Sequence, residues 1–273
     1  MIETHFVTLP VKKVFFKLTI PSVMSMFFSS IYMMADGIFV GHFVGSDALA
    51  AVNMVMPVIM ILFAVSNMIA VGSSVKVSTA LGEKNPGKAR SMFSFSTTLV
   101  MGVGVFFAAA GLLFSKPLIH QVIRENQLAE MAIQYSRVLM LGLPFIMPLF
   151  AMDNFLRVCG KARYSMWINI IVSVLNFLDW LMVAKWEWGI SASALATVIS
   201  MMIGSAFSFF PFFSKKITLY FTKPKIKKAE LLGMLYNGSS EFLSSIASSV
   251  IATLINAVLL YLGGSVAVAS YGI

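Results

Sequence analysis

Seven long apolar stretches set the strongest limit on what this chain can fold into, and a further stretch starts near Gly264. They cover roughly residues 18–40, 48–72, 92–114, 131–152, 164–184, 189–213 and 238–262. A helix of about 20 apolar residues crosses the roughly 30 Å hydrocarbon core of a bilayer. Only helices and closed barrels satisfy their backbone there, and barrel strands alternate over about ten residues, unlike these continuous runs. The sequence therefore predicts an all-α, polytopic integral membrane protein.

Composition excludes the soluble alternative. Hydrophobic residues make up 59% of the chain and charged residues 11%, against about 25% charged residues in ordinary soluble domains. A soluble protein of 273 residues could not cover its surface with so few charges.

The loop charges predict the orientation. Sixteen of the 20 Lys and Arg residues fall in one set of alternate loops. These are Lys12, Lys13, Lys17, Lys76, Lys84, Lys88, Arg90, Arg157, Lys161, Arg163, Lys215, Lys216, Lys223, Lys225, Lys227 and Lys228. By the positive-inside rule this side, with the N-terminus, is cytoplasmic. The net charge of +9 then needs no nucleic-acid partner, because basic loops attract anionic lipid headgroups.

The residues suited to catalysis or metal binding are sparse. His5, His42 and His120 are scattered, and Cys159 has no second cysteine to pair with, so we expect neither a metal cluster nor a cofactor. The first apolar stretch is too long for a secretory signal. An intramembrane enzyme would need an HExxH motif, a paired-acid motif or a Ser/His arrangement inside the spans, and none is present. We expect no enzyme activity.

An internal repeat predicts how the chain is divided. Shifting the sequence by 219 residues aligns GSDALAAVNM (45–54) with GSVAVASYGI (264–273), and Ser25, Ser29 and Ser30 with Ser244, Ser248 and Ser249. The basic segment 214–230 is then a cytoplasmic linker. Residues 1–213 form a six-helix lobe, and residues 231–273 form a seventh helix and the start of an eighth. The chain is predicted to be a fragment of a protein near 440 residues. LLGMLYNGSS (231–240) is expected to lie as an amphipathic helix at the membrane surface.

Four segments resemble the MATE (multidrug and toxic compound extrusion) family. They are ADGIFVGHFVGSDALAAV, ALGEKNPGKAR, DNFLRVCGKARYSM and GGSVAVASYGI, and the seventh stretch resembles the bacterial branches. The resemblance implies a twelve-helix antiporter in a plasma membrane, with two six-helix lobes around a central cavity. It implies export of small organic, cationic, drug-like substrates in exchange for H⁺ or Na⁺. We expect the full-length protein to be a monomer.

Asp36 is the residue that most needs explaining, because a carboxylate inside a span costs about 2.5–3.5 kcal/mol on insertion scales. It either reaches the outer interface or a neighbouring helix, or it binds the coupling cation. The resemblance favours a cation-linked acid at this position. It also suggests that the first helix bends at Pro21 when Asp36 is protonated.

The fifth span offers partners for Asp36. Asn176 and Asp179 are three residues apart, so they share one helix face. Two nearby carboxylates in a low dielectric cannot both ionise cheaply, and one should stay protonated near neutral pH. Alternatively, Asp36, Asp179 and Asn176 could supply oxygen ligands to Na⁺. The family commonly spaces this Asn and Asp four apart, which leaves the equivalence of Asn176 open.

Glu241 and Asn256 each allow two interpretations of their role. Glu241 opens the predicted seventh span, where an acid favours the helix macrodipole, but some branches of the family carry a functional acid at the matching place. Asn256 either lines the cavity or makes an interhelical hydrogen bond. Two alternatives are less favoured. A lipid-linked oligosaccharide flippase of related architecture would need a cationic central cavity, and few basic residues fall within the spans. A half-sized protein that works as a homodimer is disfavoured by the start of an eighth span near Gly264.

Overall fold

The computed structural model describes residues 10–123, 125–176, 190–214 and 217–271. Within these ranges the chain is helical, with turns and one extended segment, and has no strand. The helices are α2 (Val11–Phe39), the short π-helical segment η1 (Val40–Val44), α3 (Ser46–Gly82), α4 (Pro86–Val122), α5 (Asn126–Val158), α6 (Ala162–Leu175), α8 (Ile190–Phe213) and α9 (Lys228–Tyr271). The predicted all-α fold is confirmed.

The sequence explains where several helices begin and end. The Oδ1 atom of Asn85 accepts a hydrogen bond from the Lys88 N–H at 3.1 Å, with Pro86 as the first residue of α4; both are typical of a helix start. Gly160, at φ 75°, makes the tight turn between α5 and α6. Glu230 in the first turn of α9 accepts from the Lys227 N–H at 3.1 Å, which satisfies a backbone donor that the helix leaves unpaired.

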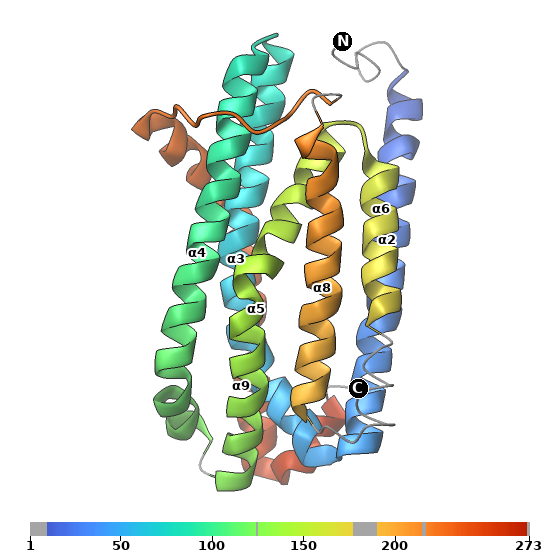
Figure 1. The fold of residues 1–273 in the computed structure, drawn as a ribbon. Helices are drawn as coiled ribbons and strands as arrows, with labels where there is room; N and C mark the ends of the chain where they lie inside the picture. The colour runs from blue at the N-terminus through green and yellow to red at the C-terminus, as the bar shows by residue number, and fades with distance from the viewer. Residues whose placement is uncertain (1–9, 124, 177–189, 215–216, 272–273) are drawn as a thin grey trace.

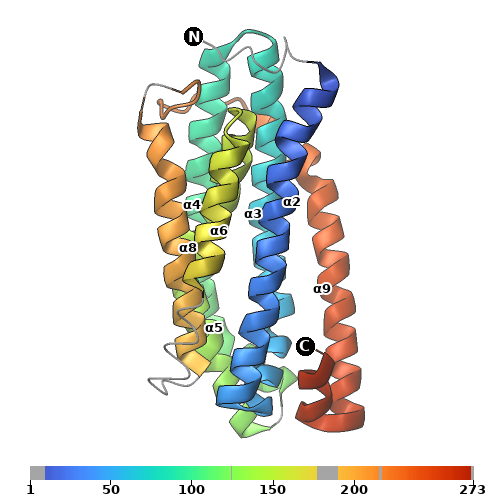
Figure 2. The ribbon, with the colours of Figure 1, turned by 90° about the vertical axis from the view of Figure 1, so that its right-hand side faces the viewer.

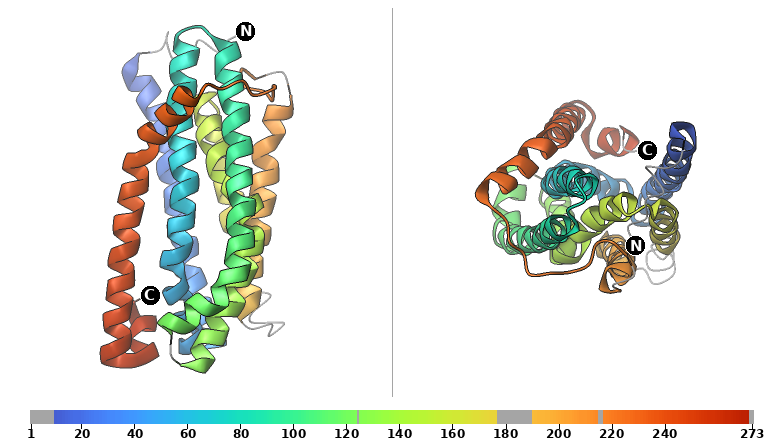
Figure 3. Two further views of the ribbon diagram at one scale, coloured as in Figure 1. Left: turned by 90° about the vertical axis from the view of Figure 1, so that its left-hand side faces the viewer. Right: turned by 90° about the horizontal axis from the view of Figure 1, so that it is seen from above.

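The helices form one upright bundle (Figure 1). α5 packs on α3, α4 and α8, while α2 packs chiefly on α6. α9 packs along α3 on the other side of the bundle (Figure 2). Seen from above, the C-terminal turn lies between α9 and α2 (Figure 3). α3 and α5 therefore form the centre of the bundle.

The structure has six helices long and apolar enough to cross a membrane among the described residues. α6 is shorter, and the remainder of the predicted span 164–184 lies outside the described residues beyond Asn176. Gly264 has φ 65° and ψ −161°, which breaks α9 into two helices, as expected where an eighth span starts. Residues 231–240, expected to lie as an amphipathic helix at the membrane surface, are helical and continue into the rest of α9.

The basic loops lie at one end of the bundle. The start of α2, the α3–α4 turn, the α5–α6 turn and the segment 217–227 are all at the upper end in Figure 1; we call it the linker end.

The segment 217–227 is fastened to α4. Arg90 Nε donates to the Thr218 carbonyl at 2.9 Å, and its guanidinium lies 4.1 Å from the centre of the Tyr220 ring. Further along, the Thr222 N–H donates to Ser94 Oγ at 2.8 Å. Ser91 Oγ accepts from the Lys225 N–H at 2.7 Å and donates to its carbonyl at 3.0 Å. The segment is therefore held against α4 at several points.

Candidate cation site and polar contacts within the bundle

A polar network at the linker end joins α2, α5 and α6. Asp153 and Arg157, one turn apart on α5, form an ion pair with 2.8 Å between Oδ2 and Nη2. Arg157 Nη1 donates to Ser22 Oγ on α2 at 2.9 Å. From α6, Ser165 Oγ and Asn169 Nδ2 both donate to Asp153 Oδ1, the latter at 3.0 Å. The Asp153–Arg157 ion pair thus holds three helices together.

Sequence reasoning missed this network. Arg157 was counted only as a loop charge, and the predicted fourth span stopped at residue 152, just before Asp153. The available signal was the Asp-x-x-x-Arg spacing, which places both side chains on one helix face. The pair is about two thirds to four fifths buried, with side-chain exposures of 21% for Asp153 and 32% for Arg157.

Asn176 follows directly after α6 as its C-terminal capping residue and is 2% exposed. Its Nδ2 donates to the Val172 carbonyl at 2.9 Å. Its Oδ1 has no hydrogen-bond partner among the described residues. A buried amide oxygen without a donor is costly, so this position suits a proton donor or a cation supplied from elsewhere.

Asp36 lies on α2, one turn before the helix ends; its side chain and all of Asp179 lie outside the described residues. The depth of Asp36 can still be compared with that of Asn176, because α2 and α6 pack together and run in the same direction from the polar network. Asp36 follows Ser22 by 14 residues and Asn176 follows Ser165 by 11, about 21 Å and 17 Å at 1.5 Å per residue. The two positions therefore lie at similar distances beyond the polar network along their helices.

Pro21 is buried within α2, directly before Ser22. Proline has no N–H, so α2 lacks one helical hydrogen bond there. Two hydroxyls bond the backbone on either side of it: Ser22 Oγ donates to the Leu18 carbonyl at 2.9 Å and Ser25 Oγ to the Pro21 carbonyl at 3.0 Å. The weakened point of α2 thus lies beside its contact with Arg157.

Glu241 does not open a helix. α9 begins at Lys228, so Glu241 lies in its fourth turn and is exposed. The macrodipole interpretation of Glu241 is therefore wrong, because that effect is confined to the first turn; Glu230 occupies that place instead. Asn256 does make an interhelical hydrogen bond, from Nδ2 to the Asn53 carbonyl on α3 at 2.7 Å.

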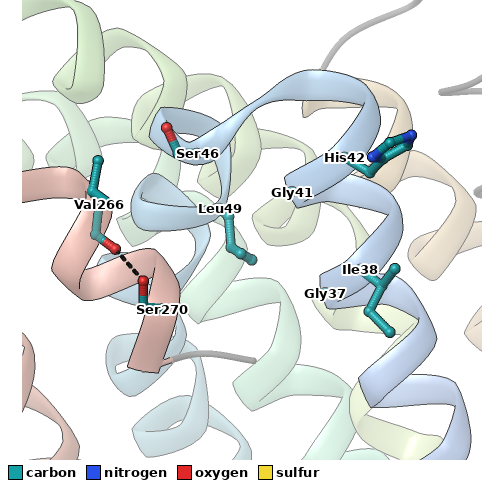
Figure 4. A pocket seen from close by; sticks show the side chains of 8 residues that line it. All are labelled: Gly37, Ile38, Gly41, His42, Ser46, Leu49, Val266 and Ser270. Carbon is teal, nitrogen blue, oxygen red and sulfur yellow. Dashed lines mark hydrogen bonds between the residues drawn. The ribbon is translucent and has the colours of Figure 1, made fainter.

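A pocket of about 360 Å³ opens between the end of α2 and the segment after Gly264. Its walls carry residues of α2 and η1 on one side, Ser46 and Leu49 of α3 in the middle, and Val266 and Ser270 opposite them (Figure 4). Gly37, next to Asp36 in the chain, lines it. In the described part of the chain no group of three His, Cys, Asp or Glu side chains could hold a metal ion.

The fold and these buried polar groups define a polytopic helical membrane protein whose spans carry acid and amide groups. A model of the MatE family matches residues 21–180, more than half of the chain. The chain belongs to the MatE family.

The relatives that it resembles are transport proteins by name. The chain is 28% identical to the multidrug export protein MepA of Staphylococcus aureus over 274 aligned residues, 98% of this chain and 60% of that protein. An outward-facing multidrug resistance MATE family transporter superposes with a TM-score of 0.85 and 27% identity, over 95% of this chain and 58% of the other. An inward-facing one gives 0.83 and 26%, over 89% and 56%.

The matches also show how much of the relatives' length the chain covers. It spans about 60% of the length of the curated relatives that it matches.

Proposed function

We propose that the protein is a cation-coupled multidrug efflux antiporter that works by alternating access. The observation that carries this proposal is the similarity to the multidrug export protein MepA, which runs along 98% of the chain. Similarity to both an outward-facing and an inward-facing transporter supports alternating access. The names of these relatives give no support to the flippase alternative or to an enzyme.

In this proposal the coupling ion is H⁺ or Na⁺, bound by Asp36 and Asp179 with Asn176. The buried Oδ1 of Asn176, without a partner in the described chain, supports a ligand there. The similar depth of Asp36 and Asn176 supports a shared site. An acid inside a span is usually part of an ion path, and carboxylate and amide oxygens suit both a proton and a hard cation. Glu241, exposed on α9, is the second candidate acid.

The proposal also covers the division of the chain into lobes, its orientation in the membrane, its substrates and its oligomeric state. Residues 1–213 are the first lobe, 214–230 the cytoplasmic linker and 231–273 the start of the second lobe. The N-terminus and the linker end face the cytoplasm across a plasma membrane, with anionic lipid beside the basic loops. The substrates are small organic cations, and the full-length protein is a monomer.

Dye efflux from proteoliposomes tests the proposal. The protein, at the length its gene encodes, is reconstituted, loaded with a cationic dye and given a pH gradient or a Na⁺ gradient. Asp36→Asn is compared with Glu125→Gln, which removes an exposed acid at the start of α5. We expect one gradient to drive efflux, Asp36→Asn to abolish it and Glu125→Gln to leave it unchanged.

Two results would count against the proposal. Normal efflux by Asp36→Asn would make Asp36 structural and place the ion site elsewhere. No dye movement under either gradient would remove the antiporter proposal and bring the flippase alternative forward.

A further inference from the structure

The segment 217–227 follows a membrane-spanning helix closely in the chain. α8 has 24 residues, about 36 Å at 1.5 Å per residue, against roughly 30 Å of hydrocarbon. Its last residue, Phe213, therefore lies near one boundary of the hydrocarbon. The segment runs along the outer side of α4 (Figure 3), and Ser91 and Ser94, in the second and third turns of α4, bind its backbone. It thus follows the perimeter of the bundle at the level of the lipid headgroups.

Three exposed lysines alternate along this segment: Lys223, Lys225 and Lys227. In an extended chain, every second side chain points to the same side. Ser91 Oγ binds both the N–H and the carbonyl of Lys225, which fixes the backbone against α4. Ile226, between the last two lysines, packs against the hydrophobic core. The lysines therefore form one row on the outer side of the segment.

The charge of this row is not neutralised by an acid in the described part of the chain. None of the three lysines forms an ion pair there. The nearest acid in the sequence, Glu230, pairs with Lys88 and accepts from the backbone of Lys227. The whole stretch 214–230 carries six lysines and this one acid. Ammonium groups gathered in this way suit a phosphate group, to which they donate charge-assisted hydrogen bonds.

Exposed aromatic rings lie beside the row. Phe213, at the end of α8, is 72% exposed, and Phe221, in the segment, is 36% exposed. Their ring centres are 5.6 Å apart, and Phe209 stacks on both. Apolar rings next to lysines are typical of a surface that lies in the membrane interface. An acidic soluble partner would use the lysines and leave the rings in water, so the rings favour a lipid.

We propose that Phe213, Phe221, Lys223, Lys225 and Lys227, here named the linker surface, bind an anionic phospholipid. The lysines donate to the oxygens of its headgroup phosphate, and the two rings contact its acyl chains. Free phosphate shares the headgroup chemistry but has no chains for the rings to contact. The inference rests on the proposed function only for the cytoplasmic side of the membrane, and it assigns to one site the general attraction of basic loops for anionic lipid.

Native mass spectrometry tests whether the surface prefers anionic lipid. The protein, at the length its gene encodes, is titrated in detergent with dioleoylphosphatidylglycerol or with dioleoylphosphatidylcholine. The dissociation constants of the first bound lipid are compared. We expect the phosphatidylglycerol to bind roughly tenfold more tightly, the equivalent of about one hydrogen bond between charged groups. Equal constants for the two lipids would overturn the proposal.

Two triple variants place the preference on the linker surface. The first replaces the row of lysines and carries Lys223→Gln, Lys225→Gln and Lys227→Gln. The matched control removes the same charge from exposed lysines elsewhere at the linker end, and carries Lys12→Gln, Lys13→Gln and Lys84→Gln. We expect the first variant to lose the preference for phosphatidylglycerol and the control to keep most of it. An equal loss in both variants would show a diffuse effect of charge and overturn the site.

Two further arms separate a lipid from other anions. Phe213→Ala should weaken the binding of both lipids by a similar factor, whereas Phe106→Ala, which removes a 66% exposed ring of α4, should leave it unchanged. Unchanged binding by Phe213→Ala, or displacement of the lipid by an equal concentration of glycerol phosphate or of a hexaglutamate peptide, would overturn the proposal. A failure of dye efflux would refute the antiporter proposal alone, since lipid binding is measured without transport.

Discussion

Arg157 on α5 donates a 2.9 Å hydrogen bond from Nη1 to Ser22 Oγ on α2, one residue after Pro21. The start of α2 is therefore tied to the centre of the bundle at the point where proline has removed a helical bond. Toward its other end α2 carries Asp36, and Tyr32 there approaches Thr197 of α8, with 3.3 Å between their hydroxyl oxygens. α2 is therefore held by neighbouring helices at two points, beside Pro21 and at Tyr32.

Arg157→Ala should destabilise the protein. The substitution leaves the mostly buried Asp153 carboxylate without its cation and removes the bond to Ser22. A hydrogen bond to a charged group contributes about 1.5–3 kcal/mol, and partial exposure of this pair reduces that to about 1–2 kcal/mol. Thermal unfolding in detergent should show a Tm several degrees lower.

Arg163→Ala is the control for Arg157→Ala, because Arg163 is an exposed arginine near the start of α6. Its Tm should stay near the parent value. Combining Arg157→Ala with Asp153→Asn should cost less than the two single changes together, since neither charge is then left alone. Equal Tm values for Arg157→Ala and Arg163→Ala would show that the network does not stabilise the bundle.

Much of the fold was predictable because the bilayer imposes helices of a minimum length on apolar sequence. The stretch 238–262 lies inside α9, and Gly264 breaks the helix where the repeat predicted a new span. Helix ends were less accurate. α3 runs to Gly82 rather than 72 and α9 starts at Lys228, because helices continue beyond the hydrocarbon where capping residues, such as Glu230, allow it.

Only part of the candidate site could be predicted from the sequence. Asn176 was singled out for its spacing from Asp179, and its burial adds to that argument. The partners of Asp153 on α6 and of Arg157 on α2 lie more than ten residues away in the sequence. Hydropathy cannot reveal such contacts, because they depend on which helices pack together. The close contact of Gly238 on α9 with α3 was hidden for the same reason.

Gly238→Ala should weaken the packing of α9 on α3. The new methyl group would lie 1.9 Å from the Met68 carbonyl oxygen, so the helices must shift. Overpacking of this kind costs about 1–3 kcal/mol. Gly102→Ala on α4 is the matched control, because a β-carbon there meets nothing within 4 Å. Thermal unfolding should show a lower Tm for Gly238→Ala only, and an unchanged Tm in both would contradict the close approach.

Arg90→Ala should loosen the segment 217–227. It removes the bond to the Thr218 carbonyl and the contact with the Tyr220 ring, together worth about 1–2 kcal/mol. Local opening then rises roughly 5–30-fold, and limited trypsin cleavage after the exposed Lys225 should speed up by a similar factor. Arg137→Ala, an exposed arginine on α5, should cleave at the parent rate. Equal rates for both variants would mean that Arg90 does not hold the segment.

Asn176→Leu should weaken binding of the coupling cation while changing the stability of the protein only slightly. The change removes a buried amide whose Oδ1 has no partner in the described chain, so the free energy of unfolding should change by less than about 1 kcal/mol. If Oδ1 is an ion ligand, the cation concentration for half-maximal efflux should rise roughly tenfold, equivalent to about 1.4 kcal/mol of binding free energy. Asn154→Leu is the control, because Asn154 Nδ2 makes the same bond to a carbonyl four residues earlier, at 2.9 Å. The half-maximal concentration should stay at the parent value in that variant. The same concentration in both variants would exclude Asn176 from the cation site and leave the coupling to the two aspartates.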